Sequence, residues 1–196
     1  MKKGFVYTIV FMIVLSAVFT FALAFSYEAF KPAIDASKQL RLERAVLYSL
    51  GLDNGLKDED VHPTFAAKIQ EGGLRGGPGY SHVENGQVVA HAVPIEGAGL
   101  WGTIRGYLGV TAALDHTTGL VFTEQNETPG LGGRIDETWY KEQFRDLPLT
   151  EGMRMSYGPL GDKTIDAVTG ATQTSSAIMR ILNATLQDDI FTKEAQ

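Results

Sequence analysis

An uncharged apolar stretch near the N-terminus constrains this chain more than any other feature of its sequence. Residues 5–25 contain no charged side chain, and they follow the basic pair Lys2 and Lys3. About 20 consecutive apolar residues are enough for one helix to cross the hydrocarbon core of a bilayer. The sequence therefore predicts that this segment enters a membrane and that the rest of the chain folds beside it.

Two fates of this segment fit its composition: a retained transmembrane helix, or a signal peptide cleaved near Ala22 and Ala24. The retained anchor, residues 1–26, is favoured because the apolar run is longer than the core of a usual signal peptide. The positive-inside rule then keeps Lys2 and Lys3 in the cytoplasm and places the following chain outside. The charge bias is weak, because four basic residues follow the run: Lys31, Lys38, Arg41 and Arg44.

Composition excludes several function classes. The formal net charge is −6, with 23 acidic and 17 basic residues, which argues against a nucleic acid partner. The chain has no cysteine, so it lacks the ligands of a thiolate-bound iron–sulfur cluster and the nucleophile of a cysteine enzyme. The four histidines show none of the close spacings typical of zinc sites, so we predict no metal.

Residues 27–79 are predicted to form a helical stalk and a connector. Apolar residues recur at helical spacing up to Leu50, with Pro32 near the start and Gly51 beyond the end. The acidic triplet at 58–60 is predicted to be a solvated loop, and the glycine-dense residues 72–79 a connector.

Residues 80–196 are predicted to form one α+β domain with a mainly antiparallel sheet flanked by helices. Residues 80–84 and 87–93 flank the turn pair Asn85 and Gly86 and indicate a hairpin, and residues 101–113 and 120–125 indicate a second. Residues 137–146 are a predicted helix, and residues 153–157 are predicted to return to the sheet.

The segment from Asp166 to Ser176 indicates a phosphate site. Apolar residues from Ile178 onward recur at helical spacing, which predicts a helix that begins between Thr169 and Thr172, with Thr169 as the N-cap. Free backbone N–H groups from Gly170 through Ala171 to Thr174 would then favour a phosphate group. The commoner explanation of such a short motif is an ordinary capped helix with solvent-facing hydroxyls.

Two glycine-flanked loops complete the set of candidate segments. Residues 97–103 place Trp101 among glycines, where a flat ligand could approach the indole; a core tryptophan explains this pattern equally well. Residues 127–133 carry Glu127 before the tight-turn pair Pro129 and Gly130, and a plain hairpin loop is the alternative. Together the three segments supply what a flavin phosphate needs: a helix N-terminus for the phosphate and apolar surfaces for the ring.

In this order, the three motifs resemble those of one family, the FMN-binding subunits of bacterial ion-translocating electron-transport complexes. They are Gly99-Leu100-Trp101, Glu127-Thr128-Pro129-Gly130-Leu131-Gly132 and Thr169-Gly170-Ala171-Thr172. Its two branches are the C subunit of the sodium-pumping NADH:quinone oxidoreductase, Nqr, and the G subunit of the Rnf ferredoxin:NAD oxidoreductase. The likeness covers nearly the whole chain, including the membrane helix and the Lys31-Pro32 exit.

The resemblance implies a covalent FMN, esterified through its phosphate to Thr172. It also implies that Asp166 matches the acidic position recognised by a flavin transferase, and that five residues pack around the isoalloxazine ring: Leu100, Trp101, Glu127, Thr128 and Leu131. The implied place is the bacterial cytoplasmic membrane, with the FMN domain on the periplasmic side and other subunits of the complex as partners. Such a subunit would carry electrons and would not turn over a substrate alone.

A separate transferase is also expected from the chemistry. A threonine hydroxyl is a weak nucleophile without an adjacent base, and neither histidine nor lysine flanks Thr172. Two rival functions remain open: a membrane-anchored binding or assembly module without a cofactor, and a solitary flavoprotein for extracellular electron transfer. The branch is open as well, because Leu100-Trp101 is more like the Nqr protein, whereas the compact length and the short segment before Asp166 are more like the Rnf protein.

Overall fold

The computed structural model of the protein describes residues 2–191 and divides into two compact units, with the boundary after Gln39. Met1 of the predicted anchor and residues 192–196 of the predicted domain lie outside the described residues, as do the side chains of Lys2 and Lys3. Each unit is described here by itself.

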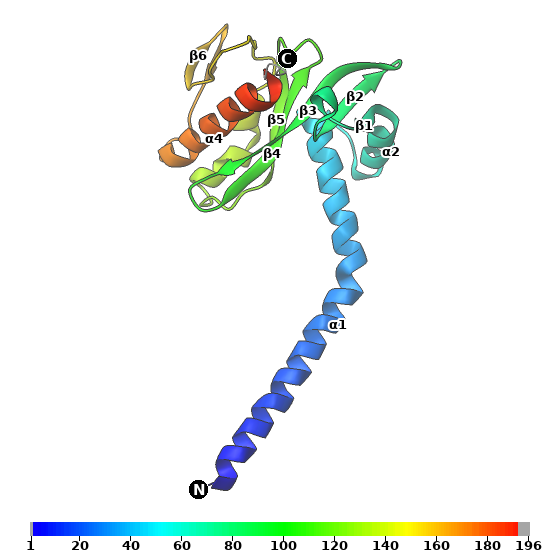
Figure 1. Ribbon diagram of the computed structural model, residues 1–196, viewed down its shortest axis with the longest axis vertical. Coiled ribbons are helices and arrows are strands. Elements are labelled where there is room, and N and C mark those ends of the chain that lie inside the picture. The colour runs from blue at the N-terminus through cyan, green and yellow to red at the C-terminus, as the bar shows by residue number, and fades with distance from the viewer. Residues whose placement is uncertain (1, 192–196) are drawn as a thin grey trace, which may run out of the picture. The chain divides into compact units, whose positions relative to one another are not determined.

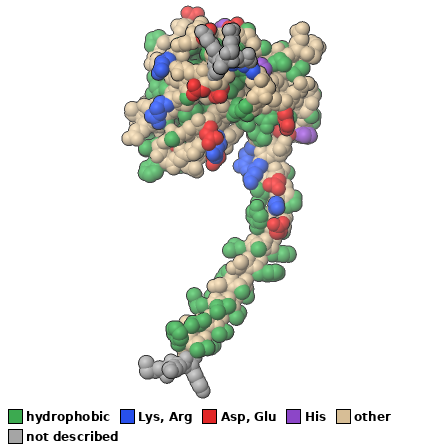
Figure 2. Space-filling view, viewed as in Figure 1, with side chains coloured by type: hydrophobic (Ala, Val, Ile, Leu, Met, Phe, Trp, Pro, Cys, Tyr) green, Lys and Arg blue, Asp and Glu red, His purple; other side chains and the backbone are tan. Residues whose placement is uncertain are grey.

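The first unit, which ends at Gln39, is formed by helix α1. This helix spans Lys2–Ser49, so its last residues, from Leu40 on, belong to the second unit. Its most apolar stretch has a mean hydropathy of 2.5 and is not buried, and α1 is the one helix within residues 2–191 that is long and apolar enough to cross a membrane. Hydrophobic side chains cover this part of the helix in Figure 2. The predicted anchor and stalk are thus one helix, with Pro32 inside it.

The C-terminal end of α1 belongs to the second unit, and it ends where the sequence predicts. Gly51 has φ +74°, and its N–H donates to the Tyr48 carbonyl at 3.0 Å, while the Leu52 N–H donates to the Leu47 carbonyl at 2.8 Å. These two bonds form a Schellman motif, which satisfies carbonyl groups that the helix leaves without partners.

The second unit is built on a five-stranded antiparallel sheet in which each strand pairs with the next along the chain. Its strands are β1 (Ile69–Glu71), β2 (Tyr80–Glu84), β3 (Gln87–Ala98), β4 (Thr103–Thr111) and β5 (Thr117–Glu124). Both predicted hairpins are confirmed, and Asn85 and Gly86 have the positive φ angles of 53° and 78° that a type I′ turn requires. Strand β1, at the edge of the sheet, lies before residue 80, which the sequence analysis predicts as the first residue of the domain.

The two faces of the sheet carry separate cores, because successive side chains of a strand point to opposite faces. On one face, Val93 and Ile95 of β3 belong to a cluster that includes Ile178 and Leu182 of helix α4 (Thr172–Thr185). The other cluster joins Ala90 and Ala92 of β3 to the end of α1 and to helix α2 (Asp58–Lys68). In Figure 1, α4 lies against the sheet, and its first turn is near the end of the sheet where β3 connects to β4.

Helix boundaries differ from prediction at two places. The acidic triplet at 58–60 is exposed as predicted, but it forms the first turn of α2 and not a loop; carboxylates there are favoured by the helix dipole. The predicted helix 137–146 is shortened to α3 (Thr138–Glu142), preceded by the 3-10 turn η2 (Gly132–Asp136). The glycine-dense connector holds a further 3-10 turn, η1 (Leu74–Gly76), and a π turn, η3 (Leu186–Ile190), follows α4.

The prediction of a strand at residues 153–157 is wrong. The N–H of Met155 donates to the Asn183 side-chain oxygen at 2.8 Å, and the Asn183 amide donates back to the Met155 carbonyl at 2.9 Å. The Asn183 side chain of α4 thus forms the two backbone hydrogen bonds of Met155 that a neighbouring strand would form in a sheet. The following residues form a small separate hairpin of β6 (Gly158–Leu160) and β7 (Lys163–Ile165), which the sequence analysis did not predict.

Candidate functional site

Helix α4 begins at Thr172, within the predicted range, but its N-cap is not the predicted Thr169. Ala171 occupies the N-cap position with φ −124°, so Thr169 lies two residues farther upstream. Gly170 takes the left-handed φ of +78°, and the Ala171 N–H turns back to the Val168 carbonyl at 3.0 Å. Thr169 and Thr172 are exposed, while Ala171 is buried. The Thr172 hydroxyl therefore stands at the surface beside the free N–H groups of a helix N-terminus.

The carboxylate of Glu127 connects the three segments that the sequence singles out. Its Oε1 accepts hydrogen bonds from the backbone N–H groups of Leu100, at 2.8 Å, and Trp101, at 3.1 Å. Its Oε2 accepts from the Thr174 hydroxyl at 2.5 Å. Glu127 is 4% exposed and Thr174 is 1% exposed. The sequence predicted these residues as one site, but not that a buried carboxylate holds them together.

Two glycines make room for this carboxylate. A Cβ atom on Gly99 would lie 2.5 Å from Glu127 Oε1, and one on Gly132 would lie 2.5 Å from Thr174 Oγ1 and 2.9 Å from Glu127 Oε2. All three distances are far below van der Waals contact, so a side chain at either position would displace the hydrogen-bonded groups. Gly99 and Gly132 are therefore explained by the space that Glu127 needs.

Three exposed apolar side chains lie at this site. Leu100, Trp101 and Leu131 are 47%, 68% and 46% exposed, so the alternative of a core tryptophan at Trp101 is wrong. A Cβ on Gly170 would lie 3.4 Å from Leu131 Cδ2, which brings Leu131 against the loop before Thr172.

The loop that carries Leu131 is a tight turn, as its sequence predicts. Gly130 has φ +74°, and the carbonyl of the exposed Thr128 accepts hydrogen bonds from the N–H groups of Leu131, at 3.1 Å, and Gly133, at 2.9 Å. This turn holds Leu131 outward at the surface.

A shallow depression of about 390 Å³ lies next to Thr169 and is lined also by Arg134, Trp139, Asp166 and Ala167. The guanidinium of Arg134 lies 5.4 Å from the centre of the Trp139 ring. The sequence analysis did not single out Arg134 for this site. It follows the 127–133 loop directly, but only the folded chain places it beside residues 166–169.

The backbone of Asp166 is held by a side chain that the sequence analysis also missed. The Asp166 N–H donates to Gln143 Oε1 at 2.6 Å, and Gln143 Nε2 donates to the Asp166 carbonyl at 3.4 Å. The Asp166 residue itself is exposed. The acidic residue before the Thr169–Thr172 motif thus lies at the surface, with its backbone hydrogen-bonded to Gln143.

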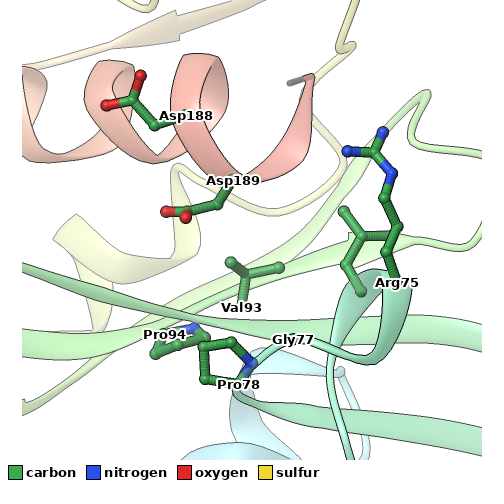
Figure 3. Close-up of a pocket in the computed structure, with 8 residues that line it drawn as sticks. Arg75, Gly77, Pro78, Val93, Pro94, Asp188 and Asp189 are labelled. Carbon is green, nitrogen blue, oxygen red and sulfur yellow. The ribbon is translucent and has the colours of Figure 1, made fainter. Parts of the chain in front are cut away.

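A second hollow, of about 310 Å³, lies away from these residues, between η1, β3 and the end of the C-terminal helix (Figure 3). Burial, together with the neighbouring charge of Asp188, raises the pKa of Asp189 in its wall. None of the predicted site residues lines this hollow.

The site fits a flavin that ends in a phosphate, because a helix N-terminus, an exposed hydroxyl and exposed apolar side chains lie together. A family model described as an FMN-binding domain matches residues 99–187, a range that contains the three motifs at 99–101, 127–132 and 169–172. The chain is thus similar to FMN-binding domains over residues 99–187. The matched range begins at the glycine that makes room for Glu127 and ends just after α4.

Two relatives are similar over most of the chain. The C subunit of the Na(+)-translocating NADH-quinone reductase of Neisseria meningitidis is 23% identical over 228 residues, which cover 90% of this chain and 88% of the relative. The G subunit of the ion-translocating oxidoreductase complex of Methanosarcina acetivorans is 27% identical over 187 residues, which cover 93% of each chain.

Two solved structures share the fold. The crystal structure of NqrC from Shewanella oneidensis superposes with a TM-score of 0.65 at 21% identity and covers 78% of this chain and 93% of that chain. The C subunit of the Na(+)-translocating NADH-quinone reductase from Parabacteroides distasonis gives 0.65 at 20% identity, with 80% and 92% covered. The α+β architecture with an antiparallel sheet flanked by helices is thereby confirmed.

Proposed function

We propose that the chain is the FMN-carrying electron-transfer subunit of a membrane-bound, ion-translocating oxidoreductase complex of the Nqr or Rnf type, with FMN joined by a phosphoester to Thr172. The observation that carries this proposal is the position of Thr172. Thr172 is exposed and is the first residue of α4. The first turn of α4 is connected through the hydrogen bond of Thr174 to Glu127, which in turn accepts from the backbone of the exposed Leu100 and Trp101. The matched FMN-binding domain and the two relatives from such complexes support it.

The proposed attachment needs a separate transferase and an activated flavin donor, a flavin phosphoanhydride. The Thr172 oxygen forms a bond to the flavin phosphorus, the anhydride P–O bond breaks and releases the other phosphate with its substituent as a monophosphate, and the hydroxyl proton passes to a base of the transferase. After attachment, the N-terminal N–H groups of α4 favour the negative phosphoester. Asp166, exposed and held by Gln143, is the proposed recognition position for that enzyme.

The proposed place of the domain is the extracytoplasmic side of a bacterial membrane, with α1 as the anchor. This side follows from the positive-inside rule applied to Lys2 and Lys3. A covalent tether suits that location, because free FMN outside the cytoplasm would be dilute and each dissociation could lose the cofactor. Bound FMN supplies one- and two-electron chemistry, while the protein positions the ring and limits its access to solvent.

The test is mass spectrometry of the Thr172 peptide from native membranes, supported by in-gel flavin fluorescence of variants. We expect FMN mass on this peptide and loss of fluorescence in Thr172→Ala. Thr123→Ala is the matched control, since it removes an exposed threonine hydroxyl from β5, outside the three motifs, and should leave the fluorescence in place. An unmodified Thr172 in cells with an active transferase would refute the proposal.

Co-purification from native membranes tests the assembly. Integral-membrane partners with a ferredoxin-type iron–sulfur protein would identify an Rnf complex, and a quinone-reductase set would identify Nqr. A flavinylated chain that purifies without partners would contradict the assignment to a complex.

A further inference from the structure

We propose that Glu127 is a positioning residue: its carboxylate sets the place of the Leu100–Trp101 loop relative to the first turn of α4 and puts a negative charge behind the flavin site. This inference rests on the proposed function, because it assumes that FMN is attached at Thr172. It differs from the expectation that Glu127 packs around the ring, since the carboxylate is occupied inside the protein.

The first argument is that both oxygens of Glu127 are already engaged. Oε1 accepts two successive backbone N–H groups, those of Leu100 and Trp101, and Oε2 accepts the Thr174 hydroxyl. Successive N–H groups that converge on one anion form a backbone anion site. Because Glu127 and Thr174 are almost fully buried, a ligand at the surface does not compete for these contacts.

The second argument concerns the loop of residues 99–102, whose ends are held by the pairing of Ala98 in β3 with Thr103 in β4. At its tip, Leu100 is 47% exposed and Trp101 is 68% exposed, so burial of these two side chains contributes little to holding the tip in place. A hydrogen bond within the loop, from the Gly99 N–H to the Gly102 carbonyl at 2.8 Å, defines its turn. The two bonds to Glu127 therefore add to the strand pairing and fix the tip of this loop relative to Glu127 and Thr174.

The third argument is that Glu127 is itself held in place. Its N–H donates to Gln125 Oε1 at 2.7 Å, and the Gln125 amide donates to Asp136 Oδ2 at 2.7 Å. Thr174 lies two residues after Thr172 in the same helical turn. A rigid connection therefore runs from η2 through Glu127 to both the apolar loop and the attachment turn.

The charge has a separate consequence. A buried carboxylate interacts with nearby charge more strongly than a solvated one, because the protein interior screens it less. Reduction adds negative charge to a flavin, so the charge of Glu127 opposes reduction and lowers the midpoint potential.

Two pairs of variants of the full chain, coexpressed with its flavin transferase, separate position from charge. Glu127→Gln preserves the shape and removes the charge; the amide oxygen can still accept from the Leu100 and Trp101 N–H groups, while the amide NH2 can donate to the Thr174 oxygen in place of accepting from it. Glu124→Gln removes a charge from an exposed carboxylate that pairs with Arg105 and is the control. Thr174→Val removes the hydroxyl and keeps the shape, and Thr174→Ser restores the hydroxyl. The measurements are the midpoint potential and the visible circular dichroism of the bound flavin, with the melting temperature alongside.

We expect a more positive potential in Glu127→Gln and an unchanged one in Glu124→Gln. We expect altered flavin dichroism in Thr174→Val, with recovery in Thr174→Ser. If Glu127→Gln and Thr174→Val change only the melting temperature, Glu127 has a purely structural role and the proposal is overturned. A wild-type chain that carries no flavin in the same experiment would instead refute the proposed function.

Discussion

Ile181 of α4 lies directly over Gly97 of β3, at a separation that leaves no space for a side chain on the strand. A Cβ on Gly97 would lie 2.5 Å from Ile181 Cγ1 and 3.1 Å from Cδ1. This contact sets how deeply α4 sits on the sheet. Because Thr172 begins the same helix, the contact also helps to set the position of Thr172, the proposed attachment residue, relative to β3.

Gly97→Ala should therefore push α4 away from the sheet and lower the free energy of unfolding by about 1–3 kcal/mol, the usual cost of overpacking a core. Urea unfolding of the variant measures this loss. In a double-mutant cycle, Ile181→Ala should reduce the cost of Gly97→Ala, because it removes the atoms that clash. Strictly additive effects would show that the two residues do not share this contact.

Trp101→Ala should leave stability nearly unchanged and alter the flavin. The side chain is 68% exposed, and exposed substitutions usually change stability by less than about 0.5 kcal/mol. Loss of the indole should nevertheless change the visible spectrum and dichroism of bound FMN. Val88→Ala, at an exposed position at the opposite end of β3 from Ala98, is the control and should change neither property.

Asn183→Leu should destabilise the domain by about 1–3 kcal/mol, because it leaves the Met155 N–H and carbonyl without their side-chain partner. Ala184→Leu, at the exposed neighbouring position of α4, should cost much less. Urea unfolding of both variants decides this. Equal losses would mean that the Asn183 hydrogen bonds contribute little to stability.

Stability should fall as the pH rises from about 10, the usual pKa of a tyrosine, towards 12. Burial raises the pKa of Tyr107 to about 12, and the neighbouring Tyr80 adds to the shift by its charge and its hydrogen bond. In this window the unfolded chain has lost the proton that the folded chain keeps, so rising pH favours unfolding. Below about pH 10, Tyr107 keeps its proton in both the folded and the unfolded chain, so it adds no pH dependence to the free energy of unfolding.

The check is the free energy of unfolding measured across this pH range for the wild type and Tyr107→Phe. The variant should lose stability less steeply with pH. Some decline should remain, because the pKa of Tyr48 is also raised, to about 12, by burial and by its contact with Glu142. Identical slopes would contradict a shifted pKa at Tyr107.

Features that depend on neighbouring residues could be predicted from the sequence. The apolar run, the Asn85–Gly86 turn and the helix end at Gly51 each follow from local composition, and each is found in the structure. Errors arose where distant groups override local pattern. Residues 153–157 alternate like a strand, but Met155 is hydrogen-bonded to Asn183, 28 residues away.

By itself, the sequence predicted which residues form the site, and the three motifs lie in order within the range that matches the FMN-binding domain. Only the tertiary structure decided what Glu127 does there. Its hydrogen-bond donors Trp101, Leu100 and Thr174 are 26, 27 and 47 residues away along the chain. Local sequence patterns do not indicate which distant groups will donate hydrogen bonds to a carboxylate. Packing of α4 on β3 and the space left by Gly99 and Gly132 bring these groups together and bury them. For that reason Glu127 lies inside the domain, while Trp101 and Thr172 are at the surface.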